Sequence, residues 1–218
     1  MNNSSDLKII ENELKLISYH YYISCLFINY EFRKKILLII YLDMEFKKII
    51  NSSVEENIIA TKLDWWKITC SESIDGKYFS VPALRLLNKY FLHNNIIKNE
   101  ILLVINLYKK YSIEKNRNKK IKLYSKYLII KKNIISRILE INYFEPSVKI
   151  SLNYLILSKS FLKHNENSIS IRLNNKAKNI CKKPKKRYLI FFLLNSNNMF
   201  TKKNILKKLF LLIFRIWY

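Results

Sequence analysis

The stretch Tyr41-Leu-Asp-Met-Glu-Phe-Lys47-Lys48-Ile-Ile-Asn51, followed by Leu63-Asp-Trp65-Trp66-Lys67, decides how this chain folds. The first stretch ends an apolar pattern typical of a long helix over Glu31–Ile50. Ser52 and Ser53 then precede Glu55 and Glu56 as two overlapping capping boxes, so we expect the next helix to start there and to carry the tryptophan pair. The two stretches therefore predict consecutive helices, one with clustered charges and one with paired aromatic rings.

Composition predicts an all-α fold in a single domain. The chain has 218 residues, 50% of them hydrophobic, with one Gly and three Pro. A chain of this length and apolar content buries a real core, and the scarcity of glycine argues against turn-rich β folds. Glycine-rich phosphate loops need more than one glycine, so Rossmann and P-loop enzymes are excluded.

The net charge of +24 permits two interpretations. A polyanionic partner is one, because an excess of cations attracts nucleic acid or an anionic membrane surface. Compositional bias is the other, since Ile, Lys and Asn are abundant and only seven of the 40 basic residues are Arg. Phosphate recognition favours the guanidinium fork, so we expect no specific nucleic-acid partner.

Cysteine and histidine usage predicts neither a disulfide framework nor a zinc site. The three cysteines and three histidines are scattered, and no Cys-x-x-Cys occurs. Reduced thiols fit the cytoplasm or an organelle matrix. The polar N-terminus does not resemble a signal peptide, and no apolar run approaches the ~18 residues of a membrane span.

We predict about eight helices in one bundle. Residues 1–163 form the main helical domain, 164–187 a basic Asn-, Ser- and Lys-rich connection, and 188–218 amphipathic C-terminal helices that dock on the same domain or contact a membrane surface. Lys109–Lys122 is predicted to be a loop. The other predicted helices are Glu11–Phe27, one opened by Ser80 and Pro82, Ile97–Tyr108, Leu123–Leu139 and Pro146–Lys163.

These landmarks resemble the squalene/phytoene synthase family. Tyr41, the Trp65-Trp66 pair and Ser80-Val-Pro82-Ala-Leu84 follow one another at the spacing of that family's opening motifs. The resemblance implies the isoprenoid-synthase helical bundle around a central cavity, with prenyl diphosphates as substrates and Mg²⁺ as cofactor. Within the family, the chain is most similar to the branch of a complex I assembly factor, which keeps the Trp pair and has lost the aspartates.

The residues at the family's metal-binding positions have lost their carboxylates. Lys47, Lys48 and Asn51 stand where the first motif has aspartates. Asp43 and Glu45 are nearby, but residues two apart on a helix point ~200° from each other and cannot chelate one ion together. The resemblance places the second motif at Lys163, His164, Glu166 and Asn167. Because Mg²⁺ requires several oxygen ligands, we expect no metal site and no catalysis.

Two features of the first motif remain open to a functional interpretation. Lys47 and Lys48 either bind a diphosphate directly or are solvated lysines on a helix surface. Trp65 and Trp66 either fill the core between helices or line a prenyl cavity. Adjacent helical residues lie ~100° apart, so one ring is expected to face the core and the other an edge or cavity.

Three hypotheses of function follow. The first is a non-catalytic assembly or interaction factor. The resemblance to the assembly-factor branch implies a respiratory complex I subunit as its partner and peripheral contact with an inner membrane. The second is a prenyltransferase that uses Mg²⁺ and binds prenyl lipids or diphosphates. The third is a basic RNA-binding protein, which requires a contiguous lysine surface with exposed aromatic rings.

Overall fold

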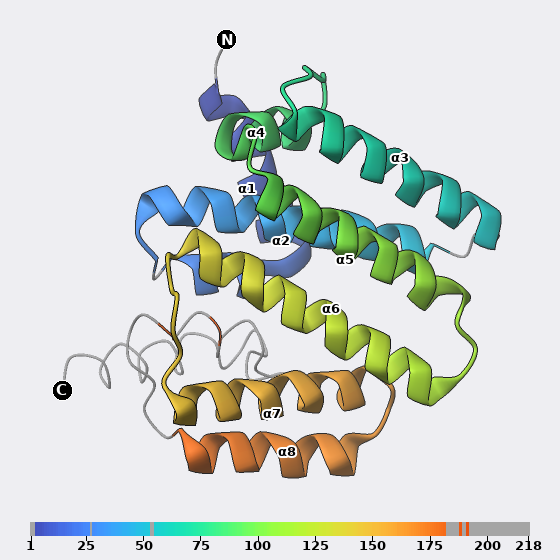
Figure 1. Cartoon of the computed structure of the whole chain (residues 1–218), viewed down its shortest axis with the longest axis vertical. Helices are drawn as coiled ribbons and strands as arrows, with labels where there is room; N and C mark the ends of the chain where they lie inside the picture. Colours follow the sequence, from blue (N-terminus) through green and yellow to red (C-terminus); the bar gives the residue numbers. More distant parts are fainter. Residues whose placement is uncertain (1–2, 27, 53–54, 182–187, 189–190, 192–218) are drawn as a thin grey trace. The chain divides into compact units, whose positions relative to one another are not determined.

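The computed structural model describes residues 3–26, 28–52 and 55–181, together with Tyr188 and Phe191. These residues are helical, without strands, which confirms the all-α prediction. The chain divides into two compact units, Met1–Ser18 with Ile28–Asn142 (unit 1) and Tyr19–Phe27 with Tyr143–Tyr218 (unit 2). Figure 1 shows the helices α1 (Asn3–Cys25), α2 (Tyr30–Asn51), α3 (Glu56–Ile74), α4 (Pro82–Phe91), α5 (Asn95–Ile113), α6 (Arg117–Ile138), α7 (Pro146–Lys163) and α8 (Asn167–Ile180).

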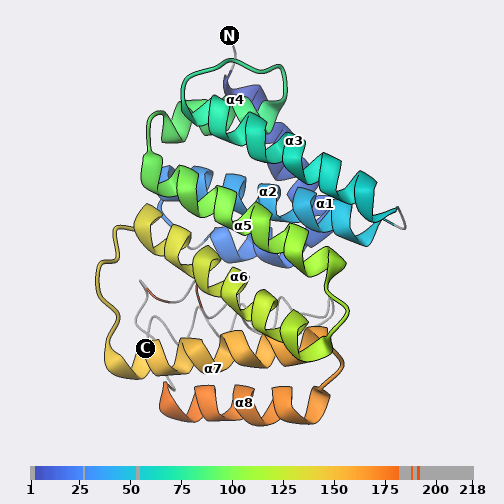
Figure 2. The ribbon, with the colours of Figure 1, turned by 45° about the vertical axis from the view of Figure 1, so that its right-hand side comes forward.

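In unit 1, α2 is the central helix and contacts α3, α4, α5 and α6. Its run Ile36–Ile40 is buried throughout, as expected of a helical segment that is apolar on all sides. Helices α3, α5 and α6 lie side by side with α5 in the middle, as both Figure 1 and Figure 2 show. This arrangement buries the middle of α2 against α5 and α6.

Salt bridges fix α3 and α5 in an antiparallel register. Lys98 Nζ lies 2.7 Å from Asp75 Oδ1, and Lys109 Nζ lies 2.6 Å from Asp64 Oδ2. The two lysines are eleven positions apart, and so are the two aspartates. Eleven residues complete about three helical turns, so both pairs lie along the same edge of the helix–helix contact.

The N-terminal part of α1 belongs to unit 1 and is held by an arginine fork. Its Leu7, Ile10 and Leu14 are buried at helical spacing. Arg85 on α4 donates to both carboxylate oxygens of Asp6, at 2.7 and 2.5 Å. These charge-assisted hydrogen bonds hold the pKa of Asp6 below its ordinary value against the opposing effect of burial. The pair of the buried Asp6 and the partly exposed Arg85 therefore ties α1 to α4.

Unit 2 contains an antiparallel hairpin of α7 and α8 with small residues at its contact. Ser151 and Ser158 on α7 are fully buried, and their hydroxyls donate to the carbonyls of Ala177 and Ser170 at 2.7 and 2.8 Å. The two serines are seven residues apart, as are their partners on α8. Small side chains at this repeat let the helix backbones approach closely. Asn165, with φ of 64°, makes the left-handed turn between the helices.

The structure changes two predicted boundaries. Residues 109–122 are not a loop, because α5 continues to Ile113 and α6 begins at Arg117, capped by the Asn116 side chain. Residues 164–187 are not only a connection, because α8 occupies Asn167–Ile180. The polar composition of both segments did not predict a helix. Burial of a few side chains, such as Ile121 and Ala177, stabilises the helix in each segment.

Helix starts also differ from the predicted caps. Ser52 ends α2, with its hydroxyl donating to the Ile49 carbonyl, and α3 begins at Glu56 after an N-cap Glu55 without a side-chain cap bond. The predicted box of Ser52 and Glu55 is therefore wrong, because Ser52 caps the preceding helix. The predicted C-terminal helices over 188–218 lie outside the described residues, apart from Tyr188 and Phe191, whose rings pack on Phe144.

Candidate functional site

The carboxylate of Asp43, on α2, is buried in unit 1 and is surrounded by hydrogen-bond donors. Only 3% of the residue is exposed. Its Oδ1 accepts from the hydroxyls of Tyr108 and Tyr127, each at 2.6 Å. Its Oδ2 accepts from the ammonium groups of Lys131 at 2.6 Å and Lys47 at 2.8 Å. These five residues are called the Asp43 cluster below, and in it each carboxylate oxygen receives two donors.

Helical spacing explains how three helices bring the Asp43 cluster together. Asp43 and Lys47 are four apart on α2, and Tyr127 and Lys131 are four apart on α6, so each pair shares a helix face. Tyr108 comes from α5. The pairs face each other across the middle of unit 1. The cluster therefore links the central helix to two of its neighbours through polar bonds inside an apolar core.

The charges of the cluster decide the protonation of Asp43. Burial by itself would raise the pKa of the carboxyl group, because it penalises the charged form. The ammonium groups of Lys131 and Lys47 outweigh that effect and hold the pKa of Asp43 far below its ordinary value. The carboxylate is thus ionised, so it cannot act as a general acid near neutral pH, and its depressed pKa makes it a weak base.

Both tyrosines of the cluster are held as neutral hydrogen-bond donors. Burial raises the pKa of Tyr108 and of Tyr127 well above the ordinary value, and the negative charge of Asp43 raises both further. Their rings lie 4.9 Å apart, and the Tyr108 ring also meets Phe46 edge-on at 6.0 Å. The hydroxyls therefore replace hydrogen bonds to water that the carboxylate lost on burial, while the rings fill the surrounding core.

A small cavity of about 20 Å³ borders the Asp43 cluster. Such a volume has room for about one water molecule. Its walls are mostly aliphatic side chains of α2, α5 and α6, with Asp43, Tyr127 and Lys131 as the polar lining. This space does not admit a prenyl chain.

The remaining residues of the first motif lie around the cluster on α2. Lys48 pairs with Glu45 at 2.5 Å and approaches Glu13 of α1 at 3.8 Å. Tyr41 is half-buried, and burial together with the charges of Glu45 and Glu13 raises the pKa of its hydroxyl. Asn51 is exposed at the end of the helix. Asp43 and Glu45 therefore engage different partners, as their angular separation on the helix predicted.

The two neighbouring tryptophans have opposite environments. Trp66 is 8% exposed and meets Phe46 edge-on at 5.8 Å, whereas Trp65 is 46% exposed. Their rings touch each other at 5.1 Å. The prediction that one ring faces the core and the other an edge is confirmed, with Trp66 as the core residue. Trp65 does not line the cavity beside Asp43.

The residues of the proposed second motif form the turn between α7 and α8 in unit 2. Lys163 ends α7, His164 is its C-cap and bonds the Ser160 carbonyl through Nδ1 at 2.7 Å. Glu166 is the N-cap of α8, and Asn167 is the first helical residue. Among the described residues, no three His, Cys, Asp or Glu side chains are grouped closely enough to hold a metal ion.

Three members of the Asp43 cluster were not predicted as site residues: Tyr108, Tyr127 and Lys131. Tyr127 lies in the predicted helix Leu123–Leu139, on an apolar stripe with Ile130 and Ile134. The sequence carried one signal, because Lys131 interrupts that stripe four residues after Tyr127 and three before Ile134. A lysine at a buried position requires a counter-charge, and Asp43 is the acidic residue that directly follows the buried run Ile36–Ile40 and Leu42 of α2.

Comparisons with protein-family models, with curated proteins and with solved structures gave no match to this chain. The resemblance to squalene/phytoene synthases therefore stays a prediction that rests on the quoted residues alone. Within the described part of the chain, no helix combines the length and the apolar character needed to cross a membrane.

Proposed function

We propose that this chain is a non-catalytic interaction factor, of the assembly-factor type that the resemblance implies. The observation that carries this proposal is the state of Asp43, whose two oxygens accept four hydrogen bonds from protein donors. Asp43, one of the two acidic residues of the degenerate first motif, thus serves to hold the helices together.

The same contacts argue against the alternative of an Mg²⁺-dependent prenyltransferase. A magnesium ion at Asp43 would have to displace Lys131 or Lys47 and would then lie beside their positive charges. Magnesium clusters in such enzymes need several carboxylates around the diphosphate. The adjacent cavity of about 20 Å³ is also too small for a prenyl substrate.

An exposed apolar face on α3 supports a protein partner. Ile58, Trp65 and Ile68 are 42%, 46% and 58% exposed and follow one another at spacings of seven and three residues. Residues at these spacings share one side of a helix. Exposed tryptophan is enriched among the residues that dominate binding energy at protein interfaces. A subunit of respiratory complex I is the partner class that the resemblance suggests.

Turnover measurements test the non-catalytic part of the proposal. The purified protein is incubated with farnesyl or geranylgeranyl diphosphate and Mg²⁺, and the products are separated by chromatography. We expect no product above background. Product formation that is lost in Asp43→Asn and retained in Glu45→Gln, with both variants folded by circular dichroism, would overturn the proposal and support the prenyltransferase.

Quantitative co-purification tests the partner. We expect complex I subunits to be enriched with the wild-type chain and to be lost with Trp65→Ser/Ile68→Ser. Ile171→Ser on α8, which replaces another exposed isoleucine, is the control and should retain them. Equal recovery from all three proteins, or no recovery of complex I subunits with the wild type, would contradict this assignment.

A further inference from the structure

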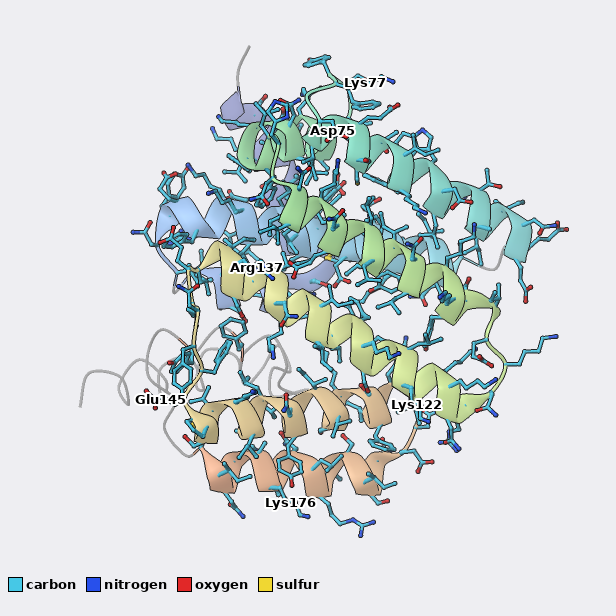
Figure 3. All side chains as sticks on the ribbon, viewed as in Figure 1. Asp75, Lys77, Lys122, Arg137, Glu145 and Lys176 are labelled. Carbon is cyan, nitrogen blue, oxygen red and sulfur yellow. The ribbon has the colours of Figure 1, made fainter. Side chains whose placement is uncertain are left out.

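The charged residues of helix α6 are all cationic, and the Asp43 cluster accounts for only one of them, Lys131. Residues 117–138 of the helix include eight cationic side chains and no acidic one. Inside unit 1, Lys131 pairs with Asp43 and Arg137 pairs with Glu100 at 3.1 Å. Figure 3 labels Arg137 near the C-terminal end of α6 and Lys122 toward the other end. The remaining cations concentrate in the N-terminal half.

Three of these residues, Lys119, Lys122 and Lys126, form a line that we call the lysine stripe. They are exposed and are spaced by three and four residues, so they lie on one face of α6 over ~10 Å. Lys115 and Arg117, directly before the stripe, are exposed as well. The opposite side of the same helix is buried, with Tyr124 and Tyr127 among its core residues. The stripe therefore faces away from the core of unit 1.

The lysine stripe is electrostatically unfavourable for its own helix. Like charges three or four residues apart repel each other on a helix surface. Cations in the first turn also oppose the positive end of the helix dipole, and the first turn of α6 contains no acidic residue. Bound anions would relieve both repulsions. A negatively charged surface of at least the stripe's length is thus the partner that this arrangement favours.

Exposed aliphatic side chains distinguish a lipid surface from a nucleic acid. Ile129 follows Lys126 by three residues on the same face of α6 and is 40% exposed, and Ile113 at the end of α5 is 52% exposed. Apolar residues beside lysines are typical of segments that lie at a bilayer interface. Single-stranded RNA is typically bound through exposed rings on which its bases stack, whereas Tyr124 is buried and the half-buried Tyr111 ring lies under the Lys120 ammonium group at 5.6 Å.

We propose that the lysine stripe, with Ile129 at its end, binds the surface of a bilayer that contains anionic phospholipids. The lysines lie over the lipid phosphates and carboxylates, and the isoleucine enters the interface between headgroups and acyl chains. This inference goes beyond the proposed function, because it rests on α6 and on none of the contacts of Asp43. A failed turnover prediction would leave it intact, and a failed lipid prediction would leave the turnover argument intact.

Vesicle sedimentation tests the proposal with the whole 218-residue chain. The partition coefficient is measured on vesicles of phosphatidylcholine alone and of phosphatidylcholine mixed with phosphatidylserine. We expect binding to the mixed vesicles only, weakening with added salt. Replacing all three lysines of the stripe by glutamine should reduce the partition roughly a hundredfold, at about fivefold for each lysine near an anionic surface.

A matched control variant shows whether vesicle binding depends on the position of the lysines or only on the net charge. Lys8, Lys62 and Lys89 are exposed elsewhere in unit 1, and changing them to glutamine removes the same three charges. We expect this control to keep most of its binding. Equal losses in the two triple variants, with both folded by circular dichroism, would show unspecific attraction and overturn the proposal.

Nucleic acid is the competing outcome. The same variants are measured against a labelled single-stranded RNA at the same salt concentration. The proposal expects Ile129→Ser to weaken vesicle binding several-fold and to leave RNA binding unchanged. If the stripe variant lost its RNA binding while vesicle binding persisted, the surface would be a nucleic-acid site and the lipid proposal would be wrong.

Discussion

Asp43 on α2 and Lys131 on α6 form a buried ion pair, with 2.6 Å between Oδ2 and Nζ, although 88 positions separate them in the chain. Lys131 is 8% exposed, so both charges have given up most of their hydration. Burial of this kind is tolerated only when each group finds opposite charge and further hydrogen bonds. Tyr108 and Tyr127 supply the remaining donors to the carboxylate. The pair therefore requires α2, α5 and α6 to be in place together.

The adjacent tryptophans predict a large difference in stability between two otherwise similar substitutions. Trp66→Ala removes a buried ring and should lower the free energy of unfolding by about 3–5 kcal/mol. Trp65→Ala removes a half-exposed ring and should cost about 1 kcal/mol. Urea unfolding followed by circular dichroism measures both. Equal losses would mean that Trp65 and Trp66 do not have the opposite environments described above.

Each tyrosine hydroxyl of the Asp43 cluster should contribute measurably to stability. Tyr108→Phe and Tyr127→Phe each delete one hydrogen bond to a charged, buried acceptor, which is expected to cost about 1.5–3 kcal/mol. The exposed Tyr143 provides the control, and Tyr143→Phe should change the free energy of unfolding by less than about 0.5 kcal/mol. Losses at Tyr108 and Tyr127 no larger than in the control would exclude the hydroxyls as donors to Asp43.

The depressed pKa of Asp43 predicts a loss of stability in acid. An aspartate whose pKa is lower in the folded than in the unfolded chain stabilises the fold at pH values above the unfolded value of about 3.9. That contribution declines as the pH falls from there toward the folded pKa. The difference in unfolding free energy between the wild type and Asp43→Asn should thus be constant near neutral pH and shrink below about pH 4. A difference that grows on acidification would have the opposite sign and refute this assignment.

The close contact of α7 and α8 predicts that a larger side chain is tolerated on one side of α8 only. Ser170 is 2% exposed and bonds Ser158, so Ser170→Leu should destabilise by about 1–3 kcal/mol through overpacking and a lost hydrogen bond. Ser168, two residues earlier, is exposed, and Ser168→Leu should be nearly neutral. Thermal unfolding measures the loss of stability in each variant. A neutral Ser170→Leu would mean that the hairpin is loosely packed.

Apolar periodicity and turn residues predicted much of the helical order. The helix Pro146–Lys163 was predicted with its observed bounds, because Pro146 fixes its start and the apolar pattern ends before a polar turn. Residues 117–122 were missed, because only Ile121 in that stretch is buried and its lysines conceal a helical turn. Residues 167–180 were missed for the same reason, since α8 buries only small side chains, which leave no apolar stripe to detect.

The candidate site was predicted only in part, because its bonds join residues far apart in the sequence. Asp43 and Lys47 were singled out from a local motif. Their partners on α5 and α6 depend on how the helices pack, and local spacing carries no information on which buried lysine meets which aspartate. The sequence shows that Lys131 stands in the apolar stripe of α6 and therefore needs a counter-charge. Only the tertiary structure shows that Asp43 is its ion-pair partner.

The central claim is that Asp43, the buried acidic residue of the degenerate motif, holds the helices together. A double-mutant cycle between Asp43 and Lys131 tests this claim most directly. Asp43→Asn, Lys131→Met and the double variant are unfolded in urea, and the same cycle on the more exposed Glu45 and Lys48 pair serves as the control. We predict that each single change at the buried pair costs about 3–5 kcal/mol and that the coupling energy is about 2 kcal/mol or more, against less than about 1 kcal/mol for the control. A coupling energy near zero between Asp43 and Lys131 would contradict the account.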